Sequence, residues 1–393
     1  MQLFAVFQSI FVNLQRSNCV FNCFCFSYMK KSSLCFLVGT VLTTATLAAQ
    51  STDSTLTQVG YNDDVNSASH PYDNDTLTYQ NPVIRKSVPD PTVLRAEDGY
   101  YYLYATESVT RNVPIYRSPD MVDWQLVGTV FTDENRPTFV ESLPKSSARI
   151  WAPDINYVDG KYYLYYSMSR WGSEWECGIG VATADSPTGP FLNHGKMFIS
   201  SDFGTQNSID PFFIEDNGRK YLFWGSFRGI WGAELTDDGL AVRPETIRQI
   251  VGTLTEGTYI LPKEGYYYLI GSAGSCCEGA NSTYHLVMAR SENLFGPYVD
   301  MSGEPALDNH FSPLLYRSDK VIGPGHNAEF MQDDAGQWWI IYHGFLADNE
   351  GEGRVGFLDR VFWSENGWPY ILDMRPSESA PKPIIKQSAA IMP

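Results

Sequence analysis

One pattern recurs five times along the chain: a short apolar strand, a turn that contains Asp, Asn, Glu or Gly, and a second strand dense in Tyr, Trp and Leu. The copies are DPTVLRAEDGYYYLYAT from Asp90, APDINYVDGKYYLYYSMS from Ala152, DPFFIEDNGRKYLFWGSF from Asp210, GTYILPKEGYYYLIGSAG from Gly257 and NAEFMQDDAGQWWIIYHGF from Asn327. Each copy predicts a β-hairpin, because the turns DG, DNG, EG and DAG supply the positive φ that a tight connection needs.

The spacing of the copies predicts the architecture. Their starts at 90, 152, 210, 257 and 327 are 62, 58, 47 and 70 residues apart, a period that suits one four-stranded blade per copy. Further apolar stretches at 112–117, 178–183 and 285–290 predict outer strands. Helical periodicity is nearly absent, which disfavours an α/β barrel. Aromatic-rich strands also build sandwiches, but the five-fold repetition favours an all-β, five-bladed β-propeller.

The start of each repeat carries a polar side chain. In a propeller the innermost strand of every blade runs along a central channel, so equivalent residues converge around one axis. The residues at or close to these starts are Asp90, Asp154, Asp210, Glu256 and His326. Four carboxylates that face one channel repel each other, which is unfavourable in a purely structural core. The cluster therefore predicts a functional centre.

The charge balance restricts the partners of such a centre. The chain has 28 Lys and Arg against 45 Asp and Glu, a formal net charge of -17, which repels nucleic acid and anionic membrane surfaces. We therefore expect no nucleic acid and no membrane as partner. A neutral polysaccharide or oligosaccharide remains compatible, and 24 Tyr, 22 Phe and 10 Trp offer surfaces for stacking. The sequence indicates no oligomeric state.

The first fifty residues are typical of a targeting segment. Lys30 and Lys31 precede an apolar run at 34–42 and a small-residue end at 45–49. We interpret residues 1–50 as an upstream extension followed by a signal peptide, with the true start at Met29. A genuine N-terminal anchor is the alternative, although the apolar run is short for a membrane span. An exported protein, periplasmic or extracellular, is expected.

Residues 51–78 are rich in Asp, Asn, Ser and Thr and predict a flexible linker, because they contain little apolar surface to bury. The propeller domain is then expected over 79–393. Only Cys177, Cys276 and Cys277 lie beyond the leader, which is no disulfide framework. The neighbours Cys276 and Cys277 are compatible with a bridge and with two buried thiols.

At the channel residues the sequence resembles the glycoside hydrolases of family 43, five-bladed propellers that act on arabinans, xylans and related pentosans. The resemblance extends from Asn81 to about Ile371. Its motifs are NPVIRKSVPDPTVLR, WAPDI, SIDPFF, TEGTYI and GPGHN. The stretch from Gly271, with its paired cysteines, STY and GPY, and the closing GPGHNAEF and YHG are similar to the arabinanase branch. The stretch Ala347 to Asp359 departs from the short turn typical of that branch.

This resemblance implies roles for three carboxylates in an inverting hydrolysis. Cleavage of a glycosidic bond needs a proton for the departing oxygen and an activated water on the opposite face of the sugar. Asp90 in VPDPT matches the general base, Glu256 in TEGTY the general acid, and Asp210 in SIDPF the carboxylate that raises the pKa of the acid. A Glu near another carboxylate in a partly desolvated channel has its neutral form favoured, as an acid requires.

Other residues are expected to bind the substrate or a metal. Trp151 in WAPDI, and with it Trp171, offers an aromatic face to a sugar. Asp154 matches no catalytic position, so we expect a structural role or a contact to sugar hydroxyls. Arg354 is a candidate for a substrate contact near the carboxylates, with a rim salt bridge as the alternative. His326 in GPGHN matches the family position that faces a metal ion, usually calcium, with waters completing its shell.

Three functions agree with these features. The first is an arabinan endo-1,5-α-L-arabinosidase-like enzyme that cleaves α-1,5-linked L-arabinofuranosyl units, in an endo or an exo mode. The second is another pentosan-active enzyme of the same fold, an α-L-arabinofuranosidase or a β-xylosidase. The third is a non-catalytic sugar-binding propeller, which the intact trio of carboxylates disfavours, because a binding module needs no acid and base together.

Overall fold

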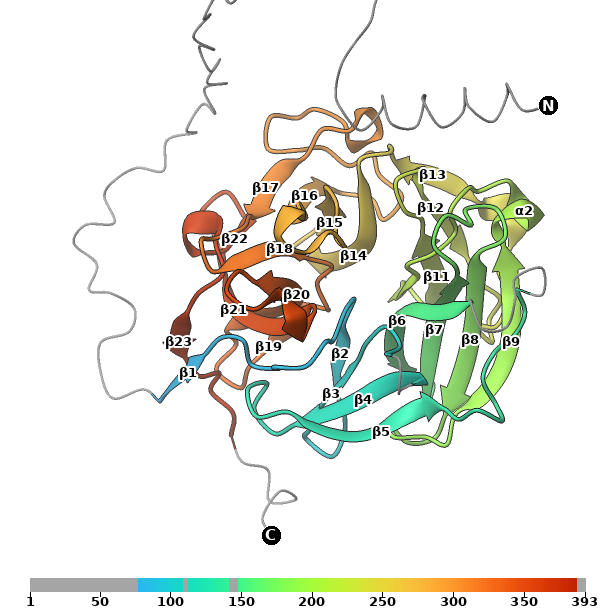
Figure 1. Cartoon of the computed structure of the whole chain (residues 1–393). Helices are drawn as coiled ribbons and strands as arrows, with labels where there is room; N and C mark the ends of the chain where they lie inside the picture. Colours follow the sequence, from blue (N-terminus) through green and yellow to red (C-terminus); the bar gives the residue numbers. More distant parts are fainter. Residues whose placement is uncertain (1–76, 109–111, 141–147, 387–393) are drawn as a thin grey trace, which may run out of the picture. The chain divides into compact units, whose positions relative to one another are not determined.

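Five antiparallel β-sheets stand around one axis in the computed structural model (Figure 1). The structure describes residues 77–108, 112–140 and 148–386. The predicted leader and nearly all of the predicted linker lie outside these residues, so both stay predictions. Within the described ranges, no helix is long and apolar enough to cross a membrane.

Each sheet is a blade of consecutive strands, which confirms the predicted five-bladed propeller. From the channel outwards, the blades are β2 (Thr92–Arg95), β3 (Tyr101–Tyr104), β4 (Asn112–Ser118) and β5 (Gln125–Phe131); β6 (Arg149–Val158), β7 (Lys161–Ser169), β8 (Gly178–Ala184) and β9 (Leu192–Ile199); β10 (Phe212–Asp216), β11 (Arg219–Trp224), β12 (Ile230–Glu234) and β13 (Arg248–Val251); β14 (Thr255–Lys263), β15 (Tyr266–Ala273), β16 (His285–Ser291) and β17 (Ser312–Leu315); and β18 (Val321–Gly325), β20 (Trp338–Leu346), β21 (Val355–Trp363) and β22 (Pro369–Tyr370). In blade five the innermost position is divided between β18 and the short β19 (Met331–Gln332), because both pair with β20.

The remaining elements are short and lie between strands. They are the single-turn helix α2 (Ser200–Phe203) and the 3₁₀ turns η2 (Pro244–Thr246), η3 (Gly279–Asn281), η4 (Ala306–Asp308), η5 (Glu350–Glu352) and η6 (Leu372–Met374).

The inner hairpins close as the turn sequences predict. Asp159–Gly160, Asn217–Gly218 and Glu264–Gly265 each have positive φ at both residues, between 51° and 82°, which is what a two-residue type I′ turn requires. In the longer turns of blades one and five, Gly99 and Gly336 alone supply the positive φ, at 86° and 79°. These turns fix the register of the two inner strands, so the residues at the start of each first strand are held at a defined depth.

A segment from the N-terminal side of the domain joins the first blade to the last. Strand β1 (Thr78–Gln80) pairs with β23 (Ser379–Pro381) beyond blade five. The chain then runs along β21, where Ile84 pairs with Gly356 and the Val88 N–H donates to the carbonyl of Arg354 at 2.9 Å. Since no blade takes strands from both ends of the chain, this packing closes the ring and brings Asp90 close to Arg354.

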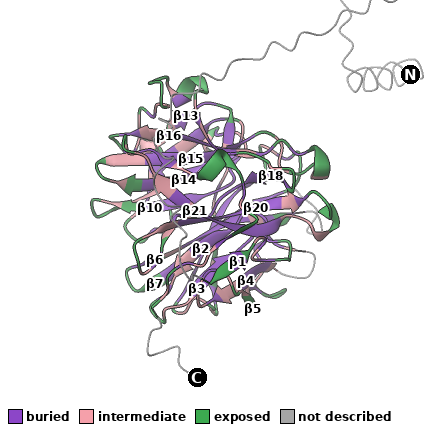
Figure 2. Cartoon of the chain, turned by 90° about the vertical axis from the view of Figure 1, so that its left-hand side faces the viewer, coloured by how far each residue is buried: buried purple, intermediate pink, exposed green. Residues whose placement is uncertain are grey.

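Aromatic contacts between neighbouring blades hold the ring together. Buried residues follow the strands and exposed ones the loops (Figure 2). Ring pairs cross from blade to blade at centroid distances of 5.2 to 5.4 Å: Phe131–Tyr166, Tyr165–Phe213, Phe212–Tyr259 and Tyr259–Phe330. Each buried aromatic pair contributes roughly 0.5–1.5 kcal/mol beyond its area. The core therefore lies between the blades, and the polar residues at the strand starts stay free to line the axis.

Candidate active site

A left-handed backbone residue marks the channel end of each blade. These residues are Asp90 (φ 53°), Ala152 (φ 38°), Asp210 (φ 56°), Gly257 (φ 59°) and His326 (φ 45°). Such a φ costs a residue with a side chain roughly 1–2 kcal/mol, and strain of this kind gathers at functional sites. From the sequence we grouped Asp154 with this ring, but Asp154 lies two places into its copy and is not part of the ring. The equivalent residue of blade two is Ala152, and Asp154 lies two residues farther along β6.

Side chains of the preceding blade hold four of these five residues. The N–H groups of Ala152, Asp210 and His326 donate to the hydroxyls of Thr106, Ser167 and Ser272, each at 2.8 Å. The N–H of Asp90 donates to His343 Nδ1 at 2.9 Å. Each acceptor follows the second strand of its blade or lies within it, so the ring is a repeated link between neighbouring blades.

The link differs at the fourth blade. Ser226, at the position of these acceptors in blade three, donates its hydroxyl to Glu256 Oε2 at 2.6 Å. The N–H of Gly257 instead donates to Asp210 Oδ2 at 3.2 Å. This exchange directs the Asp210 carboxyl towards the residue that follows Glu256. The five-fold pattern is therefore broken where two of the three proposed catalytic carboxyl groups meet.

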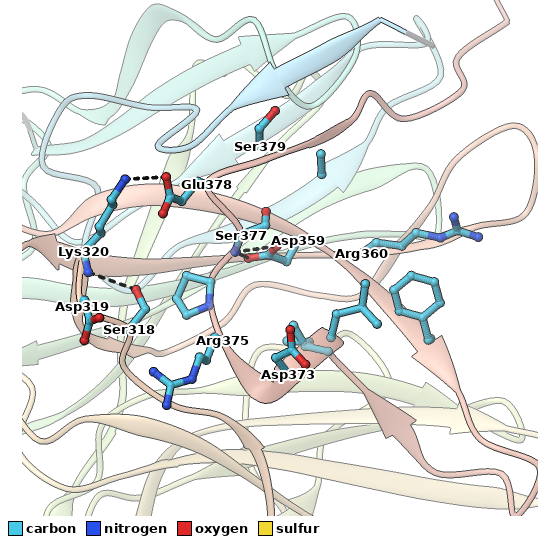
Figure 3. A pocket seen from close by; sticks show the side chains of 15 residues that line it. Ser318, Asp319, Lys320, Asp359, Arg360, Asp373, Arg375, Ser377, Glu378 and Ser379 are labelled. Carbon is cyan, nitrogen blue, oxygen red and sulfur yellow. Dashed lines mark hydrogen bonds and ion pairs between the residues drawn. The ribbon is translucent and has the colours of Figure 1, made fainter. Parts of the chain in front are cut away.

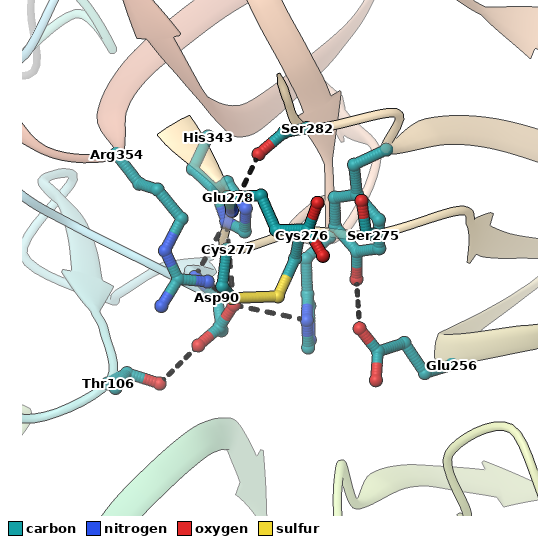
Figure 4. Close-up of a disulfide and its surroundings, with 12 residues drawn as sticks. Asp90, Thr106, Glu256, Ser275, Cys276, Cys277, Glu278, Ser282, His343 and Arg354 are labelled. Atoms are coloured by element: carbon teal, nitrogen blue, oxygen red, sulfur yellow. Dashed lines mark hydrogen bonds and ion pairs between the residues drawn. A yellow bond between two sulfur atoms is a disulfide. The ribbon is translucent and has the colours of Figure 1, made fainter. Parts of the chain in front are cut away.

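Asp90 is surrounded by groups that stabilise its charge (Figure 4). Its Oδ1 lies 2.9 Å from Arg354 Nη1 and 3.3 Å from His326 Nδ1, and its Oδ2 accepts the Thr106 hydroxyl at 2.5 Å. Burial by itself raises the pKa of Asp90, but Arg354, His326 and His343 together bring the pKa well below its usual range. Asp90 is therefore a carboxylate at neutral pH, the state that a general base requires.

Glu256 has the opposite tendency. Its Oε1 accepts the hydroxyl of Tyr284 at 2.7 Å. Burial raises the pKa of Glu256 and the charge of Asp90 adds to this, whereas Ser226, His326 and Tyr284 lower it, and the net pKa is raised. The residue is half-buried rather than sealed, as a group that reaches a substrate must be. Glu256 is thus suited to carry a proton.

Asp210 is coupled to Glu256. It is 6 % exposed. Burial raises its pKa well above the usual range, and the negative charges of Glu256 and Asp90 raise it further. Because the two carboxyl groups each disfavour ionisation of the other, the pair retains a proton at a pH at which Asp90 is charged.

Asp154 belongs to a different pair. It is 4 % exposed, and its Oδ2 accepts the N–H of Phe213 at 2.7 Å. Glu329 accepts the N–H of Val93 at 2.7 Å and the hydroxyl of Thr92 at 2.8 Å. A hydrogen bond joins the two carboxyl groups, and burial raises the pKa of both. The pair links blades two and three to blades five and one, and these contacts are those of a structural link.

A cavity of about 20 Å³ lies beside this pair and is lined from all five blades. Two of its lining atoms, Asn327 Oδ1 and Thr258 Oγ1, have no hydrogen-bond partner among the described residues. The volume suffices for one water or one small cation. His326 also lines the cavity, and no group of three or more His, Cys, Asp or Glu that could hold a metal occurs in the described ranges. Calcium takes oxygen ligands, so the oxygens of Asn327 and Thr258, with waters, are the groups here that would suit it, and His326 faces the same cavity.

Two tryptophans form a rim next to the ring. Trp151, which precedes Ala152, meets Trp171 edge-on with ring centroids 6.3 Å apart. Trp171 is 76 % exposed, whereas Trp151 is half-buried. An exposed indole beside a charged channel offers an apolar face for stacking.

A second cavity lies elsewhere on blade five (Figure 3). It measures about 520 Å³ and is lined by residues 318–320, by β21 and by the segment that leads from Ile371 into β23. Its buried acid is Asp359, whose pKa burial raises to about 6 although Ser377 and Tyr342 donate hydrogen bonds to it. None of the predicted site residues lines this cavity.

Several residues of the site were not identified from the sequence: Thr106, Ser226, Tyr284, Glu329 and His343. Thr106, Ser226 and His343 could have been found from the repeat, because a hydroxyl or an imidazole follows a Leu or Ile of the second strand by three or four residues in all five copies. Tyr284 and Glu329 have no such repeated signal. Tyr284 lies in a connection outside the aligned copies, whereas Glu329 lies two places into the fifth copy and was not singled out there.

Comparison with known proteins agrees with this geometry. The sequence model of the glycosyl hydrolases family 43 matches residues 79–369. The chain is 31 % identical over 290 residues to an extracellular endo-α-(1→5)-L-arabinanase of Bacillus subtilis, covering 71 % of this chain and 86 % of the relative. It is 30 % identical over 310 residues to an extracellular exo-α-(1→5)-L-arabinofuranosidase of Cellvibrio japonicus, covering 72 % and 86 %.

Among solved structures, an α-L-arabinanase of Cellvibrio cellulosa in complex with arabinohexaose is similar. It superposes with a TM-score of 0.64 at 28 % sequence identity, over 72 % of this chain and 95 % of that one.

Proposed function

The chain belongs to the glycosyl hydrolases of family 43, and from this premise we propose that it hydrolyses the α-1,5-linked L-arabinofuranosyl bonds of arabinan with inversion at the anomeric carbon. The relatives at 30 % identity or more are named for α-1,5-arabinan cleavage, one in the endo and one in the exo mode. A complex with arabinohexaose exists for a structural neighbour.

One observation carries the catalytic assignment: two carboxyl groups near one channel have opposite pKa shifts. The surroundings of Asp90 lower its pKa, whereas burial and the charge of Asp90 raise the pKa of Glu256, to which Asp210 is coupled. A base and an acid that coexist at one pH need this separation. A sugar-binding module has no use for it.

The reaction follows from these states. Asp90 takes a proton from a water molecule, and the water oxygen attacks the anomeric carbon from the face opposite the leaving group. The bond between the anomeric carbon and the glycosidic oxygen breaks, and Glu256 gives its proton to that oxygen. Asp210 favours the protonated form of Glu256 before the step. Arg354 keeps Asp90 charged and oriented, and Trp151 with Trp171 offers a stacking face to the neighbouring sugar.

A calcium ion held by His326 and waters belongs to the proposal. When bound, it would supply positive charge behind the carboxylates. The unpartnered oxygens of Asn327 and Thr258 support a polar occupant beside His326. Removal of divalent ions by a chelator is expected to lower the melting temperature, with recovery on adding calcium back. An unchanged melting temperature together with no calcium by elemental analysis would refute the calcium site.

Export to the periplasm or the medium is proposed as well. The two relatives named above are extracellular proteins. Fractionation of cells that express the full chain tests this, and activity retained entirely in the cytoplasm would contradict it.

The main test compares wild type with Glu256→Gln and Asp90→Asn on linear arabinan, arabino-oligosaccharides, arabinoxylan and aryl pentosides. Both variants are expected to lose activity on arabinan by about 10²–10⁴-fold. In a dinitrophenyl arabinofuranoside the leaving group is dinitrophenolate, which departs without a proton. Glu256→Gln is therefore expected to retain most of the wild-type rate on that substrate, and Asp90→Asn is not. Glu264→Gln, the same change in an exposed turn, serves as the control.

The products complete the assignment. Proton NMR of the first product detects inversion, and the lengths of the released oligosaccharides separate endo from exo cleavage. Activity only on arabinoxylan or aryl pentosides would move the assignment to another pentosan-active enzyme. A folded protein without activity on any substrate would favour the sugar-binding module.

A further inference from the structure

Cys276 and Cys277, in the loop between β15 and β16, form a disulfide bridge between neighbouring residues. This answers a question that the sequence left open. Figure 4 shows the bridge among the residues that surround it, which include Asp90, Glu256 and Arg354. Cys277 is exposed and Cys276 half-buried. The bridge thus borders both the solvent and the proposed catalytic groups.

Such a bridge contributes little to the stability of the whole domain. A disulfide stabilises a fold chiefly because it closes a loop in the unfolded chain, and the effect grows with the length of that loop. The sequence separation here is one residue, so almost no loop is closed. The consequence of the bridge is local: a closed ring restricts how the backbone and both side chains rotate.

The loop is fastened to the side of the proposed acid. The carbonyl of Ser275, next to the bridge, accepts the N–H groups of Thr283 and Tyr284, both at 3.1 Å. Tyr284 in turn donates its hydroxyl to Glu256 at 2.7 Å. The position of the bridge relative to Glu256 is therefore fixed through one buried tyrosine.

The same loop is fastened to the side of the proposed base. The N–H of Ala280 donates to Glu350 Oε2 at 2.7 Å. Gly279 leaves room for this carboxyl group, since a Cβ at that position would lie 2.2 Å from the same oxygen. Glu350 precedes Arg354 by four residues in one connection, and Arg354 holds Asp90 at 2.9 Å. The loops 274–284 and 347–354 thus form one continuous rim, here called the disulfide rim.

The chemistry of the bridge complements its surroundings. Asp90, Glu256 and Arg354 present charge and hydrogen-bonding groups, which suit sugar hydroxyls. A furanose ring also has apolar C–H faces, and these pack best against uncharged, polarizable surface. In the disulfide rim, the two sulfur atoms provide such a surface without a flexible side chain that must be ordered on binding.

We propose that the Cys276–Cys277 bridge is a wall of the sugar-binding cleft, against which the L-arabinofuranosyl unit beside Asp90 and Glu256 packs. This inference rests on the proposed function and deepens it. It makes the bridge a determinant of substrate binding and leaves the proton transfers to the carboxyl groups.

The test opens the bridge in two independent ways. The first is the double substitution Cys276→Ser and Cys277→Ser. The second is reduction of wild type with a water-soluble phosphine, which gives two electrons to the S–S bond. Water then supplies two protons to the thiols and its oxygen to the phosphine. Cys177→Ser, at a buried free thiol, is the matched control.

We expect both treatments to raise KM for arabino-oligosaccharides about tenfold, with kcat changed by less than about twofold. The phosphine has no further effect on the double variant, and the Cys177→Ser control keeps the wild-type KM and the wild-type response. The melting temperature changes by no more than a few degrees. Calorimetric titration of arabinohexaose into Glu256→Gln, with and without the bridge, is expected to show a similar loss of affinity.

Unchanged KM and unchanged affinity after the bridge is opened would overturn the proposal. A lower kcat with a displaced pH profile would overturn it too, because the bridge would then position the carboxylates and not the sugar. Inactive wild type, in contrast, refutes the proposed function and is recognised before any variant is compared.

Discussion

The ion pair between Arg354 and Asp90 leads to a quantitative prediction for Arg354→Gln. Asp90 must be ionised to accept a proton, and Arg354 is the first-ranked of the groups that lower its pKa against the effect of burial. Without the guanidinium, the effect of burial is offset less, and the pKa of Asp90 rises. The acid limb of the pH profile of kcat/KM therefore moves to higher pH.

The geometry sets the size of this effect. The charges are 2.9 Å apart at Arg354 Nη1 and Asp90 Oδ1, which at an effective dielectric constant of about 20 gives an attraction of about 6 kcal/mol. Only part of this is lost, because water and the remaining histidines compensate. A carboxylate that loses an adjacent Arg typically changes its pKa by about 1–3. The acid limb is thus expected to move up by about one to three pH units, or about 1.4–4 kcal/mol.

The assay is kcat/KM on an arabino-oligosaccharide from pH 3 to 9, a range in which wild type keeps a flat acid side and the acid limb of the variant appears. Arg360→Gln is the control, because Arg360 lies in β21, which begins just after Arg354, packs over Phe362 and lines the second cavity. The control is expected to keep the wild-type profile. Circular dichroism at each pH verifies that the variants remain folded over the range that is fitted.

An Arg354→Gln profile with the wild-type acid limb and a uniformly lower rate would refute the reasoning. Arg354 would then act on the substrate alone and leave the charge of Asp90 unaffected.

Three further predictions concern other parts of the site. Asp154→Asn removes an acid whose pKa is raised in the folded state. As pH increases, this carboxyl group ionises first in the unfolded chain. The free energy of unfolding of wild type therefore falls by up to about 1.4 kcal/mol per pH unit above the unfolded pKa. The melting temperature of the variant is expected to be close to that of wild type at pH 4 and higher than that of wild type at pH 8. If the melting temperatures of both proteins change equally with pH, Asp154 does not share a proton with Glu329. Trp171→Ala, at a ring that is 76 % exposed, should raise KM for long arabinan about 2–10-fold at an unchanged melting temperature; identical KM values would remove Trp171 from the binding surface. Ser226→Ala removes a hydrogen bond that lowers the pKa of Glu256, so the basic limb should move up by about half to one pH unit, and a move to lower pH would contradict this role.

Much of the fold could be read from the sequence because its determinants are local. Turn residues such as Asp159–Gly160 set a backbone twist that only a tight hairpin accommodates. Five copies of such a hairpin at a nearly constant period leave few arrangements other than blades around an axis. Since Asp90 and Asp210 occupy the same place in their copies, their convergence followed from the repeat alone.

The errors arose where local pattern and spatial position separate. Asp154 was grouped with Asp90 although it lies two places into its copy; the register of β6 shifts between Trp151 and Asp154, and the side chain pairs with Glu329. A bulge of this kind changes the direction of a side chain without leaving a mark in the apolar pattern.

By itself the sequence determined the strands, the turns and the residues that begin each blade, because these depend on neighbours a few positions away. Tertiary structure alone decided that Arg354 reaches Asp90 across 264 positions, that Tyr284 holds Glu256, and that the Cys276–Cys277 bridge lies beside both. The ionisation of each carboxyl group depends on burial and on charges a few ångströms away. These distances exist only after the first and last blades have closed the ring.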